Sequence, residues 1–169
     1  MALTLILTRH AKSDWGAPHL DDFDRPLNDR GHRAAPAIGA WLAGHGLTPG
    51  EVIVSGARRT VETWDGIAGA FADAPTARSE RRLYDATPDT IMAVLRGASA
   101  PVTMLIGHNP GVGQLARRLA TAAPAHPRFA DYPTCATTVF RFHREAWQDI
   151  GWGEAQVADF VVPRDLPGQ

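Results

Sequence analysis

The sequence predicts a three-layer α/β/α sandwich with a mostly parallel central sheet. Short apolar runs rich in branched residues alternate along the chain with stretches whose apolar residues recur at helical spacing. Their order is strand, helix, strand, helix, helix, strand, helix, which is typical of a parallel sheet with helices on both faces. The length of 169 residues, without a repeat or an interdomain linker, favours a single domain over residues 1–169.

The first half of the chain contains two expected strands and two expected helices. The apolar run Leu3–Thr8 ends in charged residues and suits a buried strand. Asn28 is a suitable N-cap for a helix whose apolar stripe ends near Gly44. A second strand is expected at residues 51–55, and the spacing of apolar residues predicts a helix from about residue 57 to residue 72.

The second half of the chain adds a helix that begins at Thr87-Pro88, an N-cap residue followed by proline. The remaining expected elements are a buried strand at residues 102–106, a turn at 107–111, a helix at 112–120 and strands at 137–142 and 157–162. This order completes the alternation on which the predicted parallel sheet depends.

Composition narrows the possible functions. The net charge is −1, so no overall basic field attracts nucleic acid or a membrane surface. No apolar run approaches the roughly 20 residues needed to cross a bilayer, and the first ten residues read as a strand and not as a signal peptide. The single cysteine, Cys135, excludes an internal disulfide and a cysteine-rich zinc site. We expect a cytoplasmic protein.

Three polar segments follow the three predicted parallel strands. Arg9-His10 follows the first strand, Arg58-Arg59 the second, and His108 lies in the turn after the third. Each segment alone is weak evidence, because an exposed helix end or a glycine-rich turn also accommodates these residue types. Parallel sheets bind ligands at the carboxyl ends of their strands, so we expect the three segments to converge.

Such a set of residues suits phosphoryl transfer. Two guanidinium groups can bind a phosphate dianion through paired hydrogen bonds. A neutral histidine can attack phosphorus, and a protonated histidine can stabilise the charge that spreads over the equatorial oxygens. If His10 must be neutral and His108 cationic, activity is expected to rise and fall around neutrality.

These residues carry a resemblance to a known family. Leu7–Ala11 (Leu-Thr-Arg-His-Ala) resembles the arginine-histidine signature of the histidine phosphatase superfamily, which has the phosphoglycerate-mutase-like fold. Residues 54–63 resemble its second, arginine-bearing motif, and residues 107–110 resemble its distal histidine motif. Within the superfamily the chain is most similar to the short SixA-like phosphohistidine phosphatases, through residues 9–15, 22–28, 83–88, 107–111 and 160–164.

The resemblance implies roles for individual residues. His10 resembles the nucleophile that becomes phosphorylated, and Arg9, Arg59 and His108 resemble the phosphate pocket. Arg59 matches and Arg58 does not, because Arg59 lies four residues before the threonine of the motif. Asp85 stands where many members carry an acidic proton donor, and a turn residue that caps the next helix is the alternative.

Neighbouring residues have two interpretations each. Ser13 and Asn109 either contact the phosphate or shape their loops, and Trp15 is either a wall of the cleft or part of the core. Asp24-Arg25 either orients the entry loop or touches substrate, or forms a surface ion pair, which we expect. Lys12 either reaches the phosphate or is a solvated amine, which we expect.

Other chemistries fit the sequence less well. Cys135 and Arg141 have the spacing of cysteine-dependent phosphatases, but the residues between them are strand formers, which would separate the two side chains by roughly 20 Å. No Gly-x-x-x-x-Gly-Lys loop is present, so nucleotide hydrolysis of that type is disfavoured. The other histidines lack ligand spacing, and we expect neither a metal nor a cofactor.

The resemblance implies a phosphatase that acts through a phosphohistidine enzyme intermediate. Its expected substrate is phosphohistidine on a protein, because no inter-strand segment is long enough to form a large lid over the site. The alternatives are a small phosphorylated metabolite as the substrate of a phosphomonoesterase, and a non-catalytic module that only binds phosphate.

Overall fold

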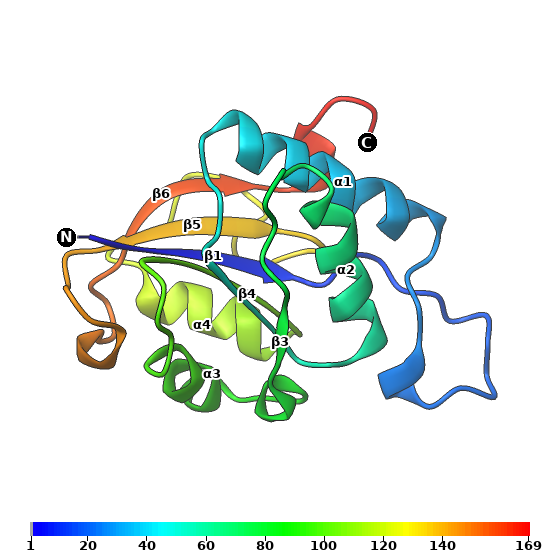
Figure 1. Ribbon diagram of the computed structural model, residues 1–169, viewed down its shortest axis with the longest axis horizontal. Coiled ribbons are helices and arrows are strands. Elements are labelled where there is room, and N and C mark those ends of the chain that lie inside the picture. Colours follow the sequence, from blue (N-terminus) through cyan, green and yellow to red (C-terminus); the bar gives the residue numbers. More distant parts are fainter. Residues whose placement is uncertain (1) are drawn as a thin grey trace.

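The computed structural model describes residues 2–169 and shows a six-stranded sheet between two layers of helices (Figure 1). The strands are β1 (Leu3–Arg9), β2 (Glu51–Val54), β3 (Arg78–Ser79), β4 (Val102–Gly107), β5 (Thr137–Phe142) and β6 (Gln156–Val161). The helices are α1 (Asp29–Gly44), α2 (Arg58–Ala68), α3 (Pro88–Leu95) and α4 (Gly111–Leu119). Short 3₁₀ helices are η1 (Asp22–Asp24), η2 (Arg81–Leu83), η3 (Trp147–Asp149) and η4 (Pro163–Asp165).

The strand order is β3-β2-β4-β1-β5-β6. β1, β2, β3 and β4 pair in parallel, β5 pairs antiparallel with β1, and β6 pairs antiparallel with β5 at the edge of the sheet. The mostly parallel α/β fold is therefore confirmed. β3 was not expected, because its two residues, Arg78 and Ser79, are exposed and carry no apolar pattern. α2 ends at Ala68, four residues before the expected end, with Gly69 as its C-cap.

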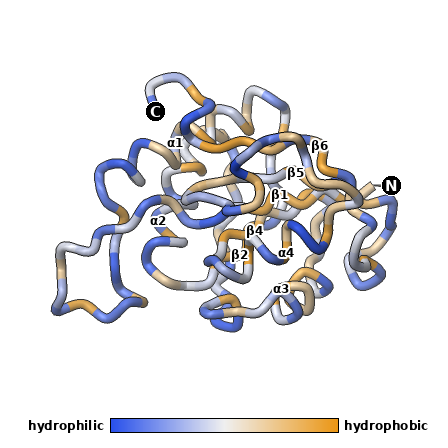
Figure 2. The backbone as a smooth tube through the Cα atoms, turned by 180° about the vertical axis from the view of Figure 1, so that it is seen from behind, coloured by the Kyte–Doolittle hydropathy of each residue, from blue (hydrophilic) through white to orange (hydrophobic). Residues whose placement is uncertain are grey.

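Each face of the sheet packs against its own pair of helices. Along β1, Leu5 and Leu7 belong to the apolar cluster under α3 and α4, whereas Ile6 belongs to the cluster under α1 and α2. Side chains alternate between the faces of a strand, so a strand buried on both faces is apolar throughout, as β1 is. Figure 2 shows the hydrophobic segments around the central strands and the hydrophilic segments in many outer loops.

Two glycines allow the first turns of α1 and α4 to pack directly against the backbone of neighbouring loops. A Cβ on Gly31, in the first turn of α1, would meet the backbone carbonyl of Lys12, and a Cβ on Gly111, at the start of α4, would meet that of Ala86. The Asn28 side chain caps α1 by accepting a hydrogen bond from the Gly31 amide at 2.9 Å. Close packing thus fixes the loops after β1 and before α3.

Among residues 2–169, no helix is both long enough and apolar enough to cross a membrane.

Candidate active site

The carboxyl ends of β1, β2 and β4 bring together the side chains that the sequence placed after three strands. Arg9 pairs with Gly107 across β1 and β4, so the next residues, His10 and His108, are neighbours. Their ring centroids are 5.2 Å apart. Arg59 lies in the first turn of α2, which follows β2. The expected convergence of the three segments is therefore present in the structure.

These side chains line a cavity of about 200 Å³. Its lining residues are Arg9, His10, Lys12, Ser13, Trp15, Arg25, Arg59, Asp85, His108, Asn109 and Thr134. Three of the basic residues, Arg9, Arg25 and Arg59, carry guanidinium groups, and only Asp85 is acidic. The cavity is therefore suited to a small anion.

His10 is buried and held in one tautomer. Its Nδ1 lies 2.7 Å from the carbonyl oxygen of Ala11. A carbonyl oxygen only accepts, so Nδ1 donates and the neutral ring keeps its lone pair on Nε2. Burial, with smaller contributions from the neighbouring His108 and Arg59, lowers the pKa of His10 to about 3. His10 is therefore neutral at pH 7, as a nucleophile must be.

Three buried nitrogen atoms in this site have no hydrogen-bond partner. They are Arg9 Nε, Arg59 Nε and His108 Nδ1, and no other buried side-chain nitrogen or oxygen in residues 2–169 is unpaired. An unpaired buried polar group costs about 1–3 kcal/mol. Since all three belong to residues that line the same cavity, a bound anion with several acceptor oxygens would satisfy the two arginine nitrogens, and also His108 Nδ1 once that ring is protonated.

The two guanidinium groups are anchored through their other nitrogens. Arg59 donates to the backbone oxygen of Asp22 at 2.6 Å and to its carboxylate at 3.0 Å. The Tyr84 hydroxyl also donates to this carboxylate, and together with Arg59 it holds the pKa of Asp22 well below its usual range. Arg9 donates to the carbonyl oxygen of Tyr132 at 3.1 Å. These contacts fix the guanidinium planes before any anion arrives.

A chain of hydroxyl groups orients His108. Its Nε2 lies 2.7 Å from Ser55 Oγ, which lies 3.1 Å from Thr60 Oγ1, and the Thr60 hydroxyl donates to the carbonyl of Ala57 at 2.7 Å. If Ser55 donates to Thr60, then His108 donates to Ser55 through Nε2. A protonated His108 would then direct its second proton, on Nδ1, toward the anion.

The charge of His108 depends on the ligand. Burial, followed by the positive charge of Arg59, lowers the pKa of His108 to about 4, so the ring is neutral at pH 7 in the ligand-free protein. A bound phosphate dianion supplies the opposite charge that favours the imidazolium. The expectation of a cationic His108 therefore applies to the complex with phosphate. An acid limb set by His10 or His108 in the ligand-free protein would therefore lie well below neutrality, and not near it as the sequence suggested.

The other expected site residues take different positions. Asp85 is exposed at the edge of the cavity with φ of 53°, in the left-handed region that aspartate tolerates. Ser13 Oγ accepts a hydrogen bond from Arg25 at 2.7 Å. Asn109 donates to the carbonyl of Tyr132 at 2.9 Å and accepts from the amide of Gly113 at 3.1 Å. In the ligand-free protein the side chains of Ser13 and Asn109 are thus engaged in shaping their loops.

The expected surface ion pair between Asp24 and Arg25 is wrong. Arg25 is only 7% exposed, and its Nε donates to the carboxylate of Asp22 at 3.0 Å. Trp15, which is 71% exposed, stacks on it with the guanidinium carbon 3.5 Å from the ring centroid. Trp15 therefore forms part of the wall of the cavity that contains His10, and it does not belong to the core. The sequence interpretation failed because the loop of residues 10–28 folds back over the strand ends, and adjacency in the chain does not show this.

Sequence reasoning also missed Ser55, Asp22 and Tyr84, which orient His108 and Arg59. Each lies within or beside a motif segment, but a serine, an aspartate and a tyrosine in such segments are equally compatible with turns and caps. Their partners are far away in the sequence. The three-dimensional positions of Arg59 and His108 are needed to show that these residues support them.

The alternative phosphatase signal is excluded by geometry. Cys135 is fully buried, and burial raises the pKa of its thiol to about 12. Arg141 lies on β5, which continues away from Cys135, and is exposed.

The choice of Arg59 over Arg58 agrees with the structure. Arg58 is exposed and pairs with Glu62 at 3.1 Å, whereas Arg59 lines the cavity. Within residues 2–169, no group of three or more histidine, cysteine, aspartate or glutamate side chains is arranged to hold a metal ion.

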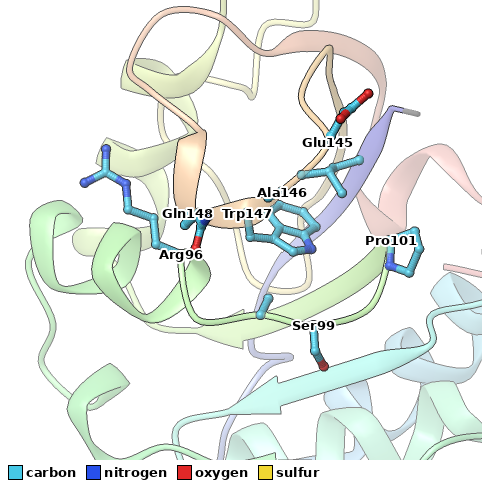
Figure 3. A pocket seen from close by; sticks show the side chains of 9 residues that line it. Arg96, Ser99, Pro101, Glu145, Ala146, Trp147 and Gln148 are labelled. Carbon is cyan, nitrogen blue, oxygen red and sulfur yellow. The ribbon is translucent and has the colours of Figure 1, made fainter.

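A second cavity, of about 230 Å³, lies at the opposite end of the sheet (Figure 3). It borders Leu3, the first residue of β1, and Pro101, which precedes β4. The indole of Trp147 closes part of it and donates to the carbonyl of Ala100 at 2.7 Å. Neither of the two site histidines borders this cavity.

The chain is similar in sequence and in structure to known proteins. Residues 5–87 match the histidine phosphatase superfamily (branch 1). An uncharacterized protein of Mycobacterium tuberculosis is 36% identical over 163 residues, which cover 92% of this chain and 99% of the relative. A candidate phosphohistidine phosphatase SixA from Nakamurella multipartitia superposes with a TM-score of 0.79 at 28% identity, with 96% of this chain and 97% of that chain covered. The protein histidine phosphatase SixA in complex with tungstate superposes with a TM-score of 0.77, over 96% of this chain and 99% of that chain, and its identity of 19% supports the fold alone.

Proposed function

The chain belongs to the histidine phosphatase superfamily and has a SixA-like, phosphoglycerate-mutase-like fold, and from this premise we propose that it hydrolyses phosphohistidine on a protein. The observation that carries the proposal is the set of three unpaired buried nitrogens, Arg9 Nε, Arg59 Nε and His108 Nδ1, beside a neutral His10. Together they provide a binding site for a tetrahedral anion and a nucleophile within it.

The reaction has two steps. In the first, the lone pair on His10 Nε2 attacks phosphorus, a P–N bond to His10 forms, and the P–N bond to the substrate imidazole breaks. The substrate ring leaves as a neutral imidazole because its other nitrogen is protonated. Arg9, Arg59 and a protonated His108 stabilise the charge on the equatorial oxygens. In the second step, water attacks phosphorus, phosphate leaves and His10 regains its lone pair.

A protein substrate is favoured by the open approach to the site. The cavity is small, at about 200 Å³, and two of its lining residues, Trp15 and Asp85, are exposed. A histidine on the surface of a partner protein can reach such a cavity without a lid having to open. An imidazole leaving group also needs little acid catalysis, so the exposed position of Asp85 is no obstacle.

A small-molecule phosphomonoesterase is the second candidate, and Asp85 is the observation that favours it. An alkoxide leaving group needs a proton donor, and Asp85 is the only acidic residue that lines the cavity.

The test compares two substrates and two variants. We expect the protein to release phosphate from a histidine-phosphorylated carrier protein and to form a labile adduct of one phosphoryl group on His10, detectable by mass spectrometry. His10→Asn should abolish both signals. His143→Asn, which changes an exposed histidine at the far end of β5, is the matched control and should retain them. Rapid hydrolysis of an alkyl phosphate with no activity on the phosphorylated carrier would refute the proposal.

A further inference from the structure

A large basic cleft lies next to the candidate active site. It has a volume of about 680 Å³ and lies between the start of α1, the loop before β5 and the segment around η4. Figure 1 shows the C-terminal end of the chain beside α1, which forms one side of this cleft. Its basic lining residues are Lys12, Arg30, Arg33, Arg128 and Arg164, and no acidic side chain lines it. We call this the basic cleft.

The charges of the basic cleft are largely uncompensated. Of its five cations, only Arg128 forms an ion pair, with Asp131 at 3.0 Å. Arg30, Arg33 and Arg164 are exposed and make no side-chain hydrogen bond or ion pair within residues 2–169.

Many other exposed arginines are paired, such as Arg82 with Glu80 and Arg144 with Glu154. The chain as a whole has a net charge of −1. The basic cleft is thus a local concentration of positive charge in a protein whose other charged residues are predominantly acidic. Like charges that are held close together repel, and an anionic partner relieves this repulsion.

The basic cleft adjoins the cavity that contains His10. Lys12 and Thr134 line both. Lys12 follows His10 by two residues, and its backbone is held against Gly31 of α1, so the distance between the two cavities is fixed by packed backbone. A ligand whose phosphoryl group lies at His10 would therefore extend along the arginines.

The chemistry of the lining indicates an acidic protein segment. Arginine binds carboxylates in paired geometry, and Arg30 and Arg33 are three residues apart on one face of α1. Ala34, Pro133, Val162 and Pro163 add apolar surface for the side-chain stems of a peptide. No aromatic side chain lines the cleft, so it offers no stacking surface for a nucleobase.

We propose that the basic cleft binds an acidic surface segment of the phosphoprotein whose phosphohistidine enters the active site. The proposal rests on the proposed function for the identity of the partner. Electrostatic complementarity of this kind increases the association rate and selects the partner, whereas the phosphoryl transfer itself depends on the residues around His10.

The first experiment measures binding without catalysis. A fluorescein-labelled octapeptide of alternating aspartate and glutamate is titrated with the protein and followed by anisotropy. The triple variant Arg30→Gln, Arg33→Gln, Arg164→Gln should weaken binding by about tenfold at low salt. The control variant Arg118→Gln, Arg141→Gln, Arg144→Gln removes the same charge from exposed residues outside the cleft and should bind as the unmodified protein does.

The second experiment measures turnover with two substrates. For a histidine-phosphorylated carrier protein with an acidic surface, the cleft variant should raise KM by about tenfold and leave kcat unchanged. For phosphoramidate, a small substrate that reaches only His10, both constants should match those of the unmodified protein.

Three results would overturn the proposal: equal weakening in the control variant, no peptide binding by the unmodified protein, or binding of inorganic tripolyphosphate in the cleft without peptide binding. Failure of the proposed function is a different result. In that case the unmodified protein does not hydrolyse the phosphorylated carrier, and the peptide titration still decides whether the basic cleft binds acidic segments.

Discussion

At the scale of single residues, the site is built from buried nitrogen atoms that have been left without hydrogen-bond partners. Arg9 Nε, Arg59 Nε and His108 Nδ1 are buried and unpaired, while the remaining nitrogens of the two guanidinium groups are tied to Tyr132 and Asp22. Folding therefore fixes two unpaired donors, Arg9 Nε and Arg59 Nε, beside His108 Nδ1, which becomes a third donor when an anion favours the protonated ring. An anion removes the energetic cost of these unpaired groups. This arrangement is suited to stabilise charge that develops on phosphoryl oxygens.

Asp85→Asn separates the two candidate substrates. Asparagine keeps the size of the side chain and tolerates the positive φ at this position, so the backbone should not change. We expect hydrolysis of phosphohistidine to fall less than about threefold, because imidazole leaves readily. Hydrolysis of an alkyl phosphate should fall by roughly 10²-fold or more, since general acid catalysis contributes that much. Phosphate release is the measurement for both. A large loss with phosphohistidine would mean that its imidazole also needs Asp85.

Ser55→Ala tests the support of His108. Without Ser55 Oγ, the Nε2–H of a protonated His108 loses its acceptor, so the imidazolium is less stable in the complex. We expect kcat to fall roughly tenfold and the alkaline limb of its pH profile to move to lower pH. Thermal unfolding checks that the protein remains folded, and Ser99→Ala, at an exposed loop remote from the site, serves as control. A fall in kcat without a shift of the alkaline limb would contradict this role.

At the scale of elements, the site depends on how closely α4 approaches the segment before α3. Gly111→Ala would place a Cβ against the backbone carbonyl of Ala86, which cannot move as a flexible side chain would. We expect unfolding free energy to fall by about 1–3 kcal/mol. Activity should also fall, because His108 and Asp85 lie in the two segments that are forced apart. Denaturant unfolding and phosphate release measure the two effects.

Gly44→Ala is the matched control for that variant. Gly44 lies in α1, and a Cβ there would meet nothing within 4 Å. Alanine favours the helix by about 1 kcal/mol relative to glycine, so this variant should be as stable as the unmodified protein or more stable. Destabilisation of both variants by the same amount would show that the contact with Ala86 is not the cause.

At the scale of the whole molecule, two buried neutral histidines make stability depend on pH. The pKa of His10 is lowered to about 3 and that of His108 to about 4, whereas the unfolded value is about 6.5. Below pH 6.5 the unfolded chain therefore binds protons that the folded chain does not. Stability is fully present above about pH 6.5 and is lost as the pH falls toward 4 and then 3.

We expect urea unfolding to show a smaller loss of stability between pH 7.5 and pH 4.5 when both histidines are replaced by asparagine. Each unit of pKa shift corresponds to about 1.4 kcal/mol, so the difference should be readily measured. His19→Asn with His143→Asn replaces two exposed histidines and serves as the control. An equal pH dependence in all three proteins would contradict the lowered pKa values.

The sequence by itself determined the layered architecture and the convergence of the main residues of the candidate site. Parallel strands are apolar throughout and are separated by amphipathic helices, so the order of elements follows from local pattern. The positions of Arg9, His10 and His108 follow from the same rule, because residues that come directly after adjacent parallel strands must meet at one edge of the sheet. Arg59 was identified through its motif, which extends into the first turn of the helix after β2.

Only the tertiary structure decided how these residues are supported and what surrounds them. Asp22, Arg25 and Ser55 have partners at other positions in the chain, and the basic cleft combines residues from four separate segments. Local sequence carries no record of such contacts, because side chains distant in the chain become neighbours only when the loops pack. The physical reason is that strand and helix patterns depend on residues two to four positions apart in the chain. Burial, pKa shifts and unpaired polar atoms depend on residues that are neighbours only in three dimensions.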